Sequence, residues 1–249
     1  MMPNIKYRGS RQQLGPLSCV VVRPDTDIPI GKVAVFCHGF GASGEDLVGL
    51  AGELLDVHAH PTNGVMLVFP AAPISLDDEG MPGGRAWWRL SIQRLMDAME
   101  AGHYERVREE VPPGIDEARD KLSQCIQAAL SLASLDEGSL LLGGFSQGAM
   151  LSVDTALRGL SEPPSQIVLF SGALICERLW KPLANRLANS EVFQSHGNFD
   201  PILPIQMGAW LRELLLESGC NVSFLEFDGP HTIPMAAITR AKEMLFTNC

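Results

Sequence analysis

Short apolar runs alternate along this chain with longer segments in which apolar residues recur every three or four positions. The longer segments predict helices, and the clearest is 115–133, whose apolar residues share one face. The short runs are apolar at consecutive positions, which is typical of strands buried on both faces of a mostly parallel sheet. The alternation therefore predicts an α/β fold with helices on both faces of the sheet. We expect strands at 17–22, 33–37, 65–69, 166–170, 191–196 and 222–227 and directly before Gly144, and helices at 45–57, 115–133, 147–160, 201–217 and 234–246.

Residues 74–113 are the least regular part of the sequence. They contain a run of acidic residues, a cluster of Gly and Pro, the pair Trp87-Trp88 and one weak helical pattern near 92–101. A long irregular connection of this kind is often functional. No repeat, low-complexity tract or linker divides the chain, so we expect a single domain over residues 1–249. Within that domain, 74–113 is the candidate for a partial lid or insertion.

The chain is organised around Gly144-Phe145-Ser146-Gln147-Gly148, which has the pattern G-x-S-x-G. A predicted strand precedes it and a predicted helix follows it, which is the context that this motif requires in serine hydrolases. The turn is expected to strain the backbone of Ser146, and the glycines let strand and helix approach closely. The first N–H groups of the helix then face whatever the Ser146 hydroxyl attacks. We predict that Ser146 is a nucleophile; the alternative is a glycine-rich turn with an incidental serine.

A serine nucleophile needs a base to accept its proton and an acid to orient that base. His231 follows the last predicted strand and Asp200 follows the one before it, so both are expected at the sheet edge where α/β sites form. Pro201 disfavours a helical conformation at Asp200. Asp228 is the competing acid, but it lies close to His231 in sequence and is expected on or just after the strand. The order Ser146, Asp200, His231 is the one expected after this motif.

Two backbone N–H donors are also needed where negative charge develops during attack on a carbonyl. The residue after the nucleophile, Gln147, supplies one, and the loop His38-Gly39-Phe40-Gly41 is expected to supply the other through Phe40. The glycines beside Phe40 let the backbone turn its N–H inward. We expect His38 to hydrogen bond within this loop instead of acting as a second base. Of the other histidines, His58 and His60 are expected to be exposed at a helix end, and His103 lies in the irregular region.

Together these residues resemble the phospholipase/carboxylesterase group of α/β-hydrolases, which contains acyl-protein thioesterases and small bacterial carboxylesterases. The resemblance implies the α/β-hydrolase fold and a serine esterase with Ser146, Asp200 and His231 as triad. It further implies oxyanion donors at Phe40 and Gln147 and no cofactor. The chain departs from the group's usual pattern at Ala149 and Arg89. The matching motifs are 38–41, 70–73 followed by Trp87-Trp88, 144–148, 196–204 and 229–231.

The composition, 46% hydrophobic and 19% charged, fits a globular protein. A formal net charge of -10 disfavours nucleic acid or an anionic membrane surface as the main partner. The six cysteines form no C-x-x-C and are expected to be buried thiols, and no metal site is predicted. No membrane span or signal-like run is visible, so we expect a cytoplasmic protein, as a monomer or a homodimer.

Three functions fit these motifs. The first is a serine carboxylesterase that hydrolyses small to medium acyl esters through an acyl-enzyme intermediate. The second is an acyl-thioesterase or lysophospholipase that acts on longer acyl chains. The third is a non-catalytic binding protein of the same fold, which is disfavoured because no member of the triad is missing. The expected partner is a small-molecule ester or thioester.

Trp87 and Trp88 have two interpretations. Because Trp is usually well buried, each indole can fill a gap beneath the irregular segment. Alternatively, at least one lines the acyl pocket, and Gly83-Gly84 lets the segment hinge as a partial lid. We predict the second arrangement and treat Trp87 and Trp88 as candidate substrate-binding residues.

Overall fold

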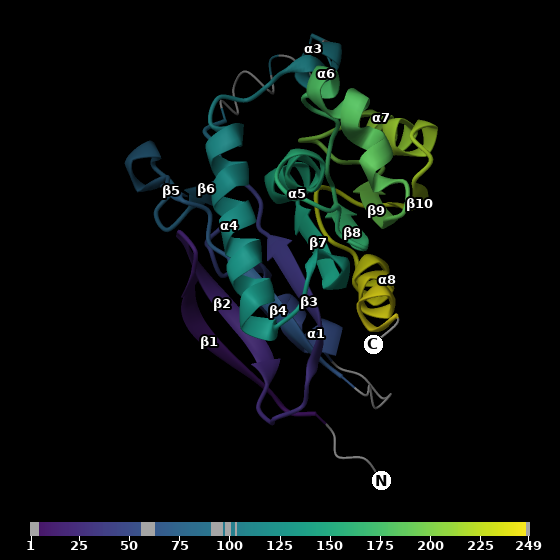
Figure 1. Cartoon of the computed structure of the whole chain (residues 1–249). Coiled ribbons are helices and arrows are strands. Elements are labelled where there is room, and N and C mark those ends of the chain that lie inside the picture. The colour runs from purple at the N-terminus through teal and green to yellow at the C-terminus, as the bar shows by residue number, and fades with distance from the viewer. Residues whose placement is uncertain (1–4, 56–62, 91–96, 98–100, 103, 248–249) are drawn as a thin grey trace.

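The structure is a computed structural model that describes residues 5–55, 63–90, 97, 101–102 and 104–247 (Figure 1). Several of the features expected from sequence lie outside these ranges: His58, His60, His103, Cys249 and most of the helix predicted near 92–101.

Eight strands form one sheet in the order β1-β2-β4-β3-β7-β8-β9-β10. Strand β2 is antiparallel to both of its neighbours, and the other neighbouring pairs are parallel. The predicted, mostly parallel sheet is therefore confirmed. The strands are β1 (Tyr7–Leu14), β2 (Leu17–Pro24), β3 (Ile30–Cys37), β4 (Gly64–Pro70), β7 (Leu140–Phe145), β8 (Gln166–Phe170), β9 (Glu191–Gly197) and β10 (Asn221–Phe227).

Helices cover both faces of this sheet, as predicted (Figure 1). Successive side chains of a strand point to opposite faces, so Val33 and Val35 of β3 join one apolar core and Ala34 and Phe36 join the other. The first core lies under α4 (Ile115–Ala133), α5 (Gln147–Arg158) and α7 (Ile205–Glu217). The second lies under α1 (Leu50–Leu55) and α8 (Met235–Phe246).

The structure also contains elements that the apolar pattern does not predict. Strand β1 escapes detection because it is polar and lies at the sheet edge, where only Leu14 is fully buried. The segment expected to be helical from residue 45 begins with a 3-10 turn, η1 (Asp46–Gly49), before α1. The remaining short elements are the hairpin β5 (Ile74–Ser75) and β6 (Arg85–Ala86), the helices α3 (Tyr104–Glu109) and α6 (Glu177–Trp180), and the 3-10 turns η2 (Asp77–Glu79), η3 (Glu137–Ser139) and η4 (Lys181–Leu187).

A buried lysine fixes the end of α8 against the amino-terminal edge of the sheet. Lys32 is 5% exposed, and its Nζ donates to Gln166 Oε1 at 2.7 Å and to the carbonyl oxygen of Thr247 at 2.8 Å. A third bond of 3.2 Å reaches the carbonyl oxygen of Met244. A cation at a helix carboxyl end is favourable because the helix dipole is negative there. Gln166 therefore has a structural role far from the strand ends that carry the predicted site.

The five cysteines within the described part of the chain are buried free thiols, as expected. In that same part of the chain, no helix combines the length and the apolar character needed to cross a membrane.

Candidate active site

The motif 144–148 forms a sharp turn between β7 and α5, which we name the elbow. Ser146 has φ 55° and ψ −118°, a conformation that is costly for a residue with a Cβ. A Cβ on Gly144 would lie 2.6 Å from the carbonyl oxygen of Cys37, and one on Gly148 would lie 2.1 Å from the same atom. Only glycine therefore allows α5 to pack this closely on β3, and the strain expected at Ser146 is present.

His231 lies in the loop after β10, and its Nδ1 is 2.6 Å from Asp200 Oδ2 in the loop after β9. The other Asp200 oxygen, Oδ1, accepts the N–H groups of Ile202 at 2.9 Å and Leu203 at 2.8 Å. Burial acts to raise the pKa of Asp200, but the hydrogen bond from His231 and these N–H groups outweigh it, so the pKa lies below its ordinary value. An ionised Asp200 accepts the Nδ1 proton and leaves His231 Nε2 free to act as a base.

The competing acid, Asp228, has a different environment. Its side chain is exposed, and its Oδ1 accepts a hydrogen bond of 3.0 Å from the amide of Asn198. The structure therefore brings His231 to Asp200, as the sequence order predicts, and gives Asp228 a partner of its own.

Ser146 and His231 line the same cavity, and the Phe145 and His231 rings lie 4.7 Å apart between centroids. The described residues include no hydrogen bond between the Ser146 hydroxyl and His231. In serine hydrolases this contact is often long in the free enzyme and tightens when substrate binds.

A second histidine supports the acid and was not expected from sequence. His196 is fully buried at the end of β9, and its Nε2 donates to the carbonyl oxygen of Leu203 at 2.7 Å. The same nitrogen is 3.4 Å from Asp200 Oδ2. Burial lowers the pKa of His196, which favours the neutral ring. It fixes the loop whose N–H groups hold Asp200.

The predicted oxyanion donors lie on two segments that meet at the elbow. Gln147 is the first residue of α5, and the first N–H groups of a helix have no partner within the helix. The N–H of Phe40 has no hydrogen-bond acceptor among the described residues. A Cβ on Gly39 would lie 3.4 Å from Ser146 Cβ, so this loop packs directly against the elbow.

His38 has the structural role expected from the sequence. Its Nδ1 donates to the carbonyl oxygen of Gly39 at 2.8 Å, and its Nε2 accepts the N–H of Ala72 at 3.0 Å. Burial lowers its pKa, which favours the neutral ring that these two bonds require.

A cavity of about 730 Å³ contains Ser146, His231, Phe40 and Gln147 on its wall. This size is typical of small-molecule pockets. Its wall is formed by the segments after β3, β7, β8, β9 and β10, by the start of α5 and by parts of 88–113. Its lining also includes four exposed charged residues, Asp46, Arg89, Arg106 and Glu110. The apolar lining residues are Phe40, Ala42, Trp88, Leu90, Val107, Pro112, Pro113, Phe145, Met150, Ile175, Ile202 and Leu203.

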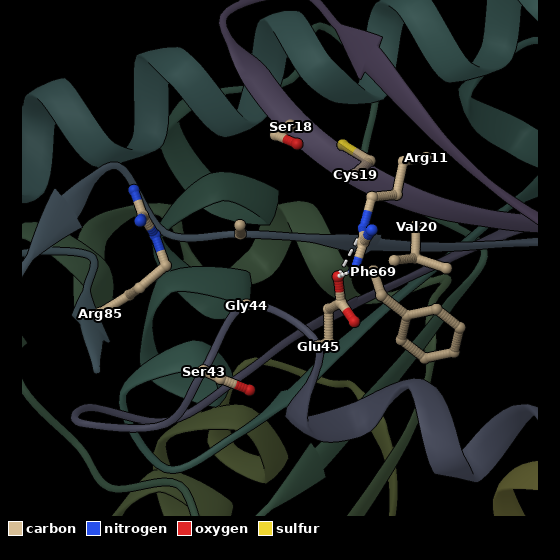
Figure 2. A pocket seen from close by; sticks show the side chains of 10 residues that line it. Arg11, Ser18, Cys19, Val20, Ser43, Gly44, Glu45, Phe69 and Arg85 are labelled. Atoms are coloured by element: carbon tan, nitrogen blue, oxygen red, sulfur yellow. Dashed lines mark hydrogen bonds and ion pairs between the residues drawn. The ribbon is translucent and has the colours of Figure 1, made fainter. Parts of the chain in front are cut away.

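Figure 2 shows a second cavity, of about 360 Å³, between β1, β2 and the segment after Phe40. Arg11 and Glu45 form an ion pair across it, with 2.5 Å between Arg11 Nη2 and Glu45 Oε1. None of the predicted site residues lines this cavity. Among the described residues, no group of three or more His, Cys, Asp or Glu is arranged to hold a metal ion.

The two tryptophans lie in different surroundings. Trp87 is 1% exposed, its indole N–H donates to the carbonyl oxygen of His38 at 2.9 Å, and it is absent from the cavity wall. Trp88 is fully buried and lines the cavity. The structure thus puts Trp87 behind the loop 38–41, where it fills space beneath the irregular segment, and Trp88 at the cavity wall.

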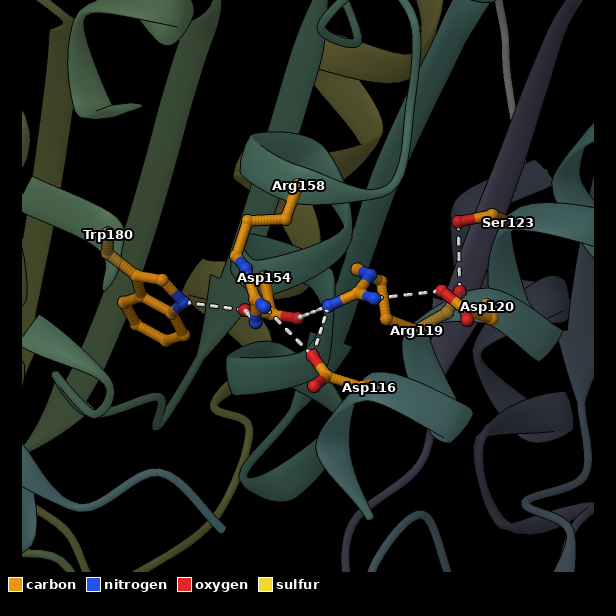
Figure 3. Close-up of polar contacts among 7 residues, drawn as sticks. All are labelled: Asp116, Arg119, Asp120, Ser123, Asp154, Arg158 and Trp180. Atoms are coloured by element: carbon orange, nitrogen blue, oxygen red, sulfur yellow. Dashed lines mark hydrogen bonds and ion pairs between the residues drawn. The ribbon is translucent and has the colours of Figure 1, made fainter. Parts of the chain in front are cut away.

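A buried ionic network fixes the elbow helix on its far side (Figure 3). Asp154 of α5 is fully buried and accepts bonds from Arg158 Nη1 at 2.9 Å and from the indole N–H of Trp180 at 2.8 Å. Arg119 of α4 is 3.5 Å from the other Asp154 oxygen. Such a buried charge is tolerated only when it is paired. The network joins α4, α5 and α6, and an ion pair of 2.5 Å between Arg108 and Glu177 joins α6 to α3, beside the cavity.

Three known proteins whose sequences are similar to this chain are each named acyl-protein thioesterase 1. The chain is 30% identical to acyl-protein thioesterase 1 of Kluyveromyces lactis over 78% of this chain and 80% of that protein. It is 28% identical to acyl-protein thioesterase 1 of Debaryomyces hansenii over 87% and 88% of the two chains. A similarity to acyl-protein thioesterase 1 of Neurospora crassa, at 31% identity, spans 46% of this chain and 49% of that protein.

Solved structures resemble this one in fold. A carboxylesterase from Mesorhizobium loti has a TM-score of 0.72 at 16% identity, covering 95% of this chain and 98% of that chain. Acyl-protein thioesterase 2 of Zea mays has a TM-score of 0.61 at 23% identity, covering 91% and 96%.

The sequence profile described as Phospholipase/Carboxylesterase matches residues 19–248 of this chain. That match begins within β2, covers the later strands of the sheet and contains every residue of the predicted site. The alternative of an incidental serine in a glycine-rich turn is thereby disfavoured. The chain belongs to the phospholipase/carboxylesterase family and is a serine hydrolase of the α/β-hydrolase class.

Proposed function

We propose that this protein is a serine carboxylesterase that hydrolyses esters of small to medium acyl groups through an acyl-enzyme intermediate. Ser146 is the nucleophile, His231 the base, and Asp200 the acid that orients His231. The N–H groups of Phe40 and Gln147 form the oxyanion hole. One observation carries the proposal: a single cavity, with largely apolar walls and a volume of about 730 Å³, brings Ser146, His231 and both N–H donors together.

In the first half of the reaction, Ser146 Oγ attacks the ester carbonyl carbon while its proton passes to His231 Nε2. The carbonyl oxygen becomes an oxyanion and accepts hydrogen bonds from the N–H groups of Phe40 and Gln147. When this intermediate collapses, the bond to the alcohol breaks and the alcohol takes the proton from His231. The acyl group is then bound to Ser146 as an ester.

In the second half, a water molecule attacks the acyl carbon and gives its proton to His231 Nε2. Collapse of the second oxyanion breaks the bond to Ser146 Oγ, which recovers the proton. The products are the carboxylic acid and the free enzyme. Asp200 stays ionised throughout and stabilises the imidazolium that forms in each half, which agrees with its lowered pKa.

The proposal predicts a profile of rate against acyl length. We expect kcat/KM on p-nitrophenyl esters to peak at short or medium acyl groups and to fall for long ones, because the cavity bounds the apolar surface that can be buried. The measurement is kcat/KM across the ester series, beside thioesters of the same acyl groups.

The same series tests the second candidate, an acyl-thioesterase or lysophospholipase that acts on longer chains. The two relatives named acyl-protein thioesterase 1 in Kluyveromyces lactis and Debaryomyces hansenii, at 30% and 28% identity, favour this candidate. A kcat/KM that rises steadily with acyl length and is greater for thioesters than for the matched oxygen esters would select it and reject our assignment.

Trp88 offers a prediction about chain length. Trp88→Phe keeps a ring in the core but enlarges the cavity, so longer acyl groups should gain contacts. Each further buried CH₂ is worth about 0.8 kcal/mol, or roughly fourfold in kcat/KM, and the gain should appear mainly in KM. We therefore expect the preferred acyl length to increase, as measured with the same ester series.

The matched control is Trp180→Phe, because Trp180 is also fully buried but does not line the cavity. It loses the hydrogen bond to Asp154 and should lower the melting temperature without changing the preferred acyl length. If both variants keep the wild-type preference, Trp88 does not set the preferred acyl length. The prediction that 74–113 moves as a partial lid is separate and stays a prediction.

A further inference from the structure

The side chain of Gln147 is buried, 1% exposed, and both ends of its amide are bonded to one short segment of backbone. Its Oε1 accepts the N–H of Trp87 at 3.0 Å, and its Nε2 donates to the carbonyl oxygen of Trp88 at 2.8 Å. The mechanism proposed above uses only the backbone N–H of Gln147. The side chain therefore has a pair of buried hydrogen bonds that the chemistry does not require.

The same segment is bonded, at its other end, to the loop that carries Phe40. The N–H of Gly41 donates to the carbonyl oxygen of Arg85 at 2.9 Å, and the N–H of Arg85 donates to the carbonyl oxygen of Ala42 at 3.0 Å. The indole N–H of Trp87 donates to the carbonyl oxygen of His38 at 2.9 Å. Residues 85–88, which we name the brace, thus hold the loop on both sides of Phe40.

We propose that Gln147 is a positioning residue for the oxyanion hole, because its side chain ties the elbow to the brace and so fixes the spacing of the two N–H donors. This inference rests on the proposed function. The sheet fixes only the base of the two segments, where Cys37 of β3 is paired with Gly144 of β7. Beyond that pair the loop packs against the elbow at Gly39, but no backbone hydrogen bond joins the two segments among the described residues. The brace supplies hydrogen bonds to both of them, near Phe40 and at Gln147.

The amide is well suited to this role because it offers one donor and one acceptor in a fixed plane. A carboxylate of the same length could accept from Trp87 but could not donate to Trp88, and a thioether accepts only weakly and cannot donate. Burial matters as well, since no water replaces a lost partner at 1% exposure. An electrostatic site of this kind is effective only when its donors are held in place before charge develops.

The test is Gln147→Met, which keeps the length of the side chain and removes both bonds. Outright loss of one oxyanion donor costs about 10²–10³ in kcat, so a misplaced pair should cost about tenfold to 10²-fold. KM on a medium-length p-nitrophenyl ester should change by less than about threefold, because ground-state contacts are retained. The inhibition constant of a matched trifluoromethyl ketone, whose adduct carries an oxyanion, should rise by the same factor as kcat/KM falls.

The matched control is Gln166→Met. Gln166 is also buried and hydrogen-bonded, to Lys32 and Glu191, at the opposite edge of the sheet. Both variants should lower the melting temperature, but only Gln147→Met should lower kcat and the affinity for the trifluoromethyl ketone. A methyl ketone without fluorine should bind Gln147→Met and wild type alike.

A second variant keeps the inference testable if Gln147→Met does not fold. Trp87→Phe removes the indole N–H that holds His38 and keeps an aromatic ring in the core. It should lower kcat by about tenfold and raise the inhibition constant of the trifluoromethyl ketone by the same factor. In the double variant the two losses should be less than multiplicative, since both act on one unit.

The outcomes separate this inference from the proposed function. If the wild-type protein hydrolyses no ester and does not bind the trifluoromethyl ketone, both the proposed function and this inference are wrong. If the wild type is active and both Gln147→Met and Trp87→Phe match it in kcat and in ketone affinity, the role of the brace is wrong and the proposed function stands. A loss of kcat as large in Gln166→Met would also overturn it, because the effect would then reflect stability alone.

Discussion

Ser146→Ala is expected to lower kcat on a p-nitrophenyl ester by about 10⁶-fold, as loss of the nucleophile does in subtilisin. The hydroxyl makes no hydrogen bond within the described part of the chain, so its removal should change the melting temperature little. The measurement is kcat beside thermal unfolding of both proteins.

Ser146→Gly is the informative companion to this variant. The backbone at Ser146, with φ 55°, stores strain of about 1–3 kcal/mol that glycine relieves, at an entropic cost of about 0.5–1 kcal/mol. We expect Ser146→Gly to be as inactive as Ser146→Ala and at least as stable as the wild type. Substantial activity in either variant would show that another group attacks the substrate.

Asp200→Asn is expected to lower kcat by about 10⁴-fold, the loss seen when the acid of a serine-protease triad becomes an amide. The carboxylate accepts the Nδ1 proton of His231 over 2.6 Å and so leaves Nε2 unprotonated. An amide can present its NH₂ to Nδ1 instead, which selects the wrong tautomer. The expected signature is a large fall in kcat with little change in KM, measured with a medium-length ester.

Asp228→Asn is the control for that variant, because Asp228 is the competing acid and lies close to His231 in sequence. Its side chain is exposed and bonded to Asn198, so the change should leave kcat within about threefold, as surface substitutions usually do. A crippled Asp228→Asn enzyme, or an Asp200→Asn enzyme close to the wild-type rate, would mean that the acid has been wrongly assigned.

Much of the fold follows from the pattern of apolar residues. The predicted bounds of α4 and β8 agree with the structure, because both elements bury a continuous face or run of side chains against the sheet. Strand β1 could not be predicted in this way, since an edge strand is stabilised by backbone hydrogen bonds to β2 and needs few buried side chains.

Some residues of the candidate site could likewise be predicted from the sequence, and others could not. Ser146, Asp200 and His231 follow strands, and a parallel sheet brings such positions to one edge, so the sequence was sufficient to group them. The roles of His196, Trp87 and the Gln147 side chain depend on bonds between distant segments, such as the one between Trp87 and Gln147. Nothing in local spacing encodes those bonds. Trp87 illustrates the difference, because its apolar character suggested a pocket wall, whereas its indole N–H is bonded to the carbonyl oxygen of His38.

The central claim is that Ser146 is the nucleophile, and covalent labelling tests it most directly. The wild-type protein is treated with a fluorophosphonate, and the modified peptide is identified by mass spectrometry. We expect a single adduct, located on Ser146, and no labelling of Ser146→Ala. Labelling that persists in Ser146→Ala, or an adduct on another residue of the wild type, would contradict it.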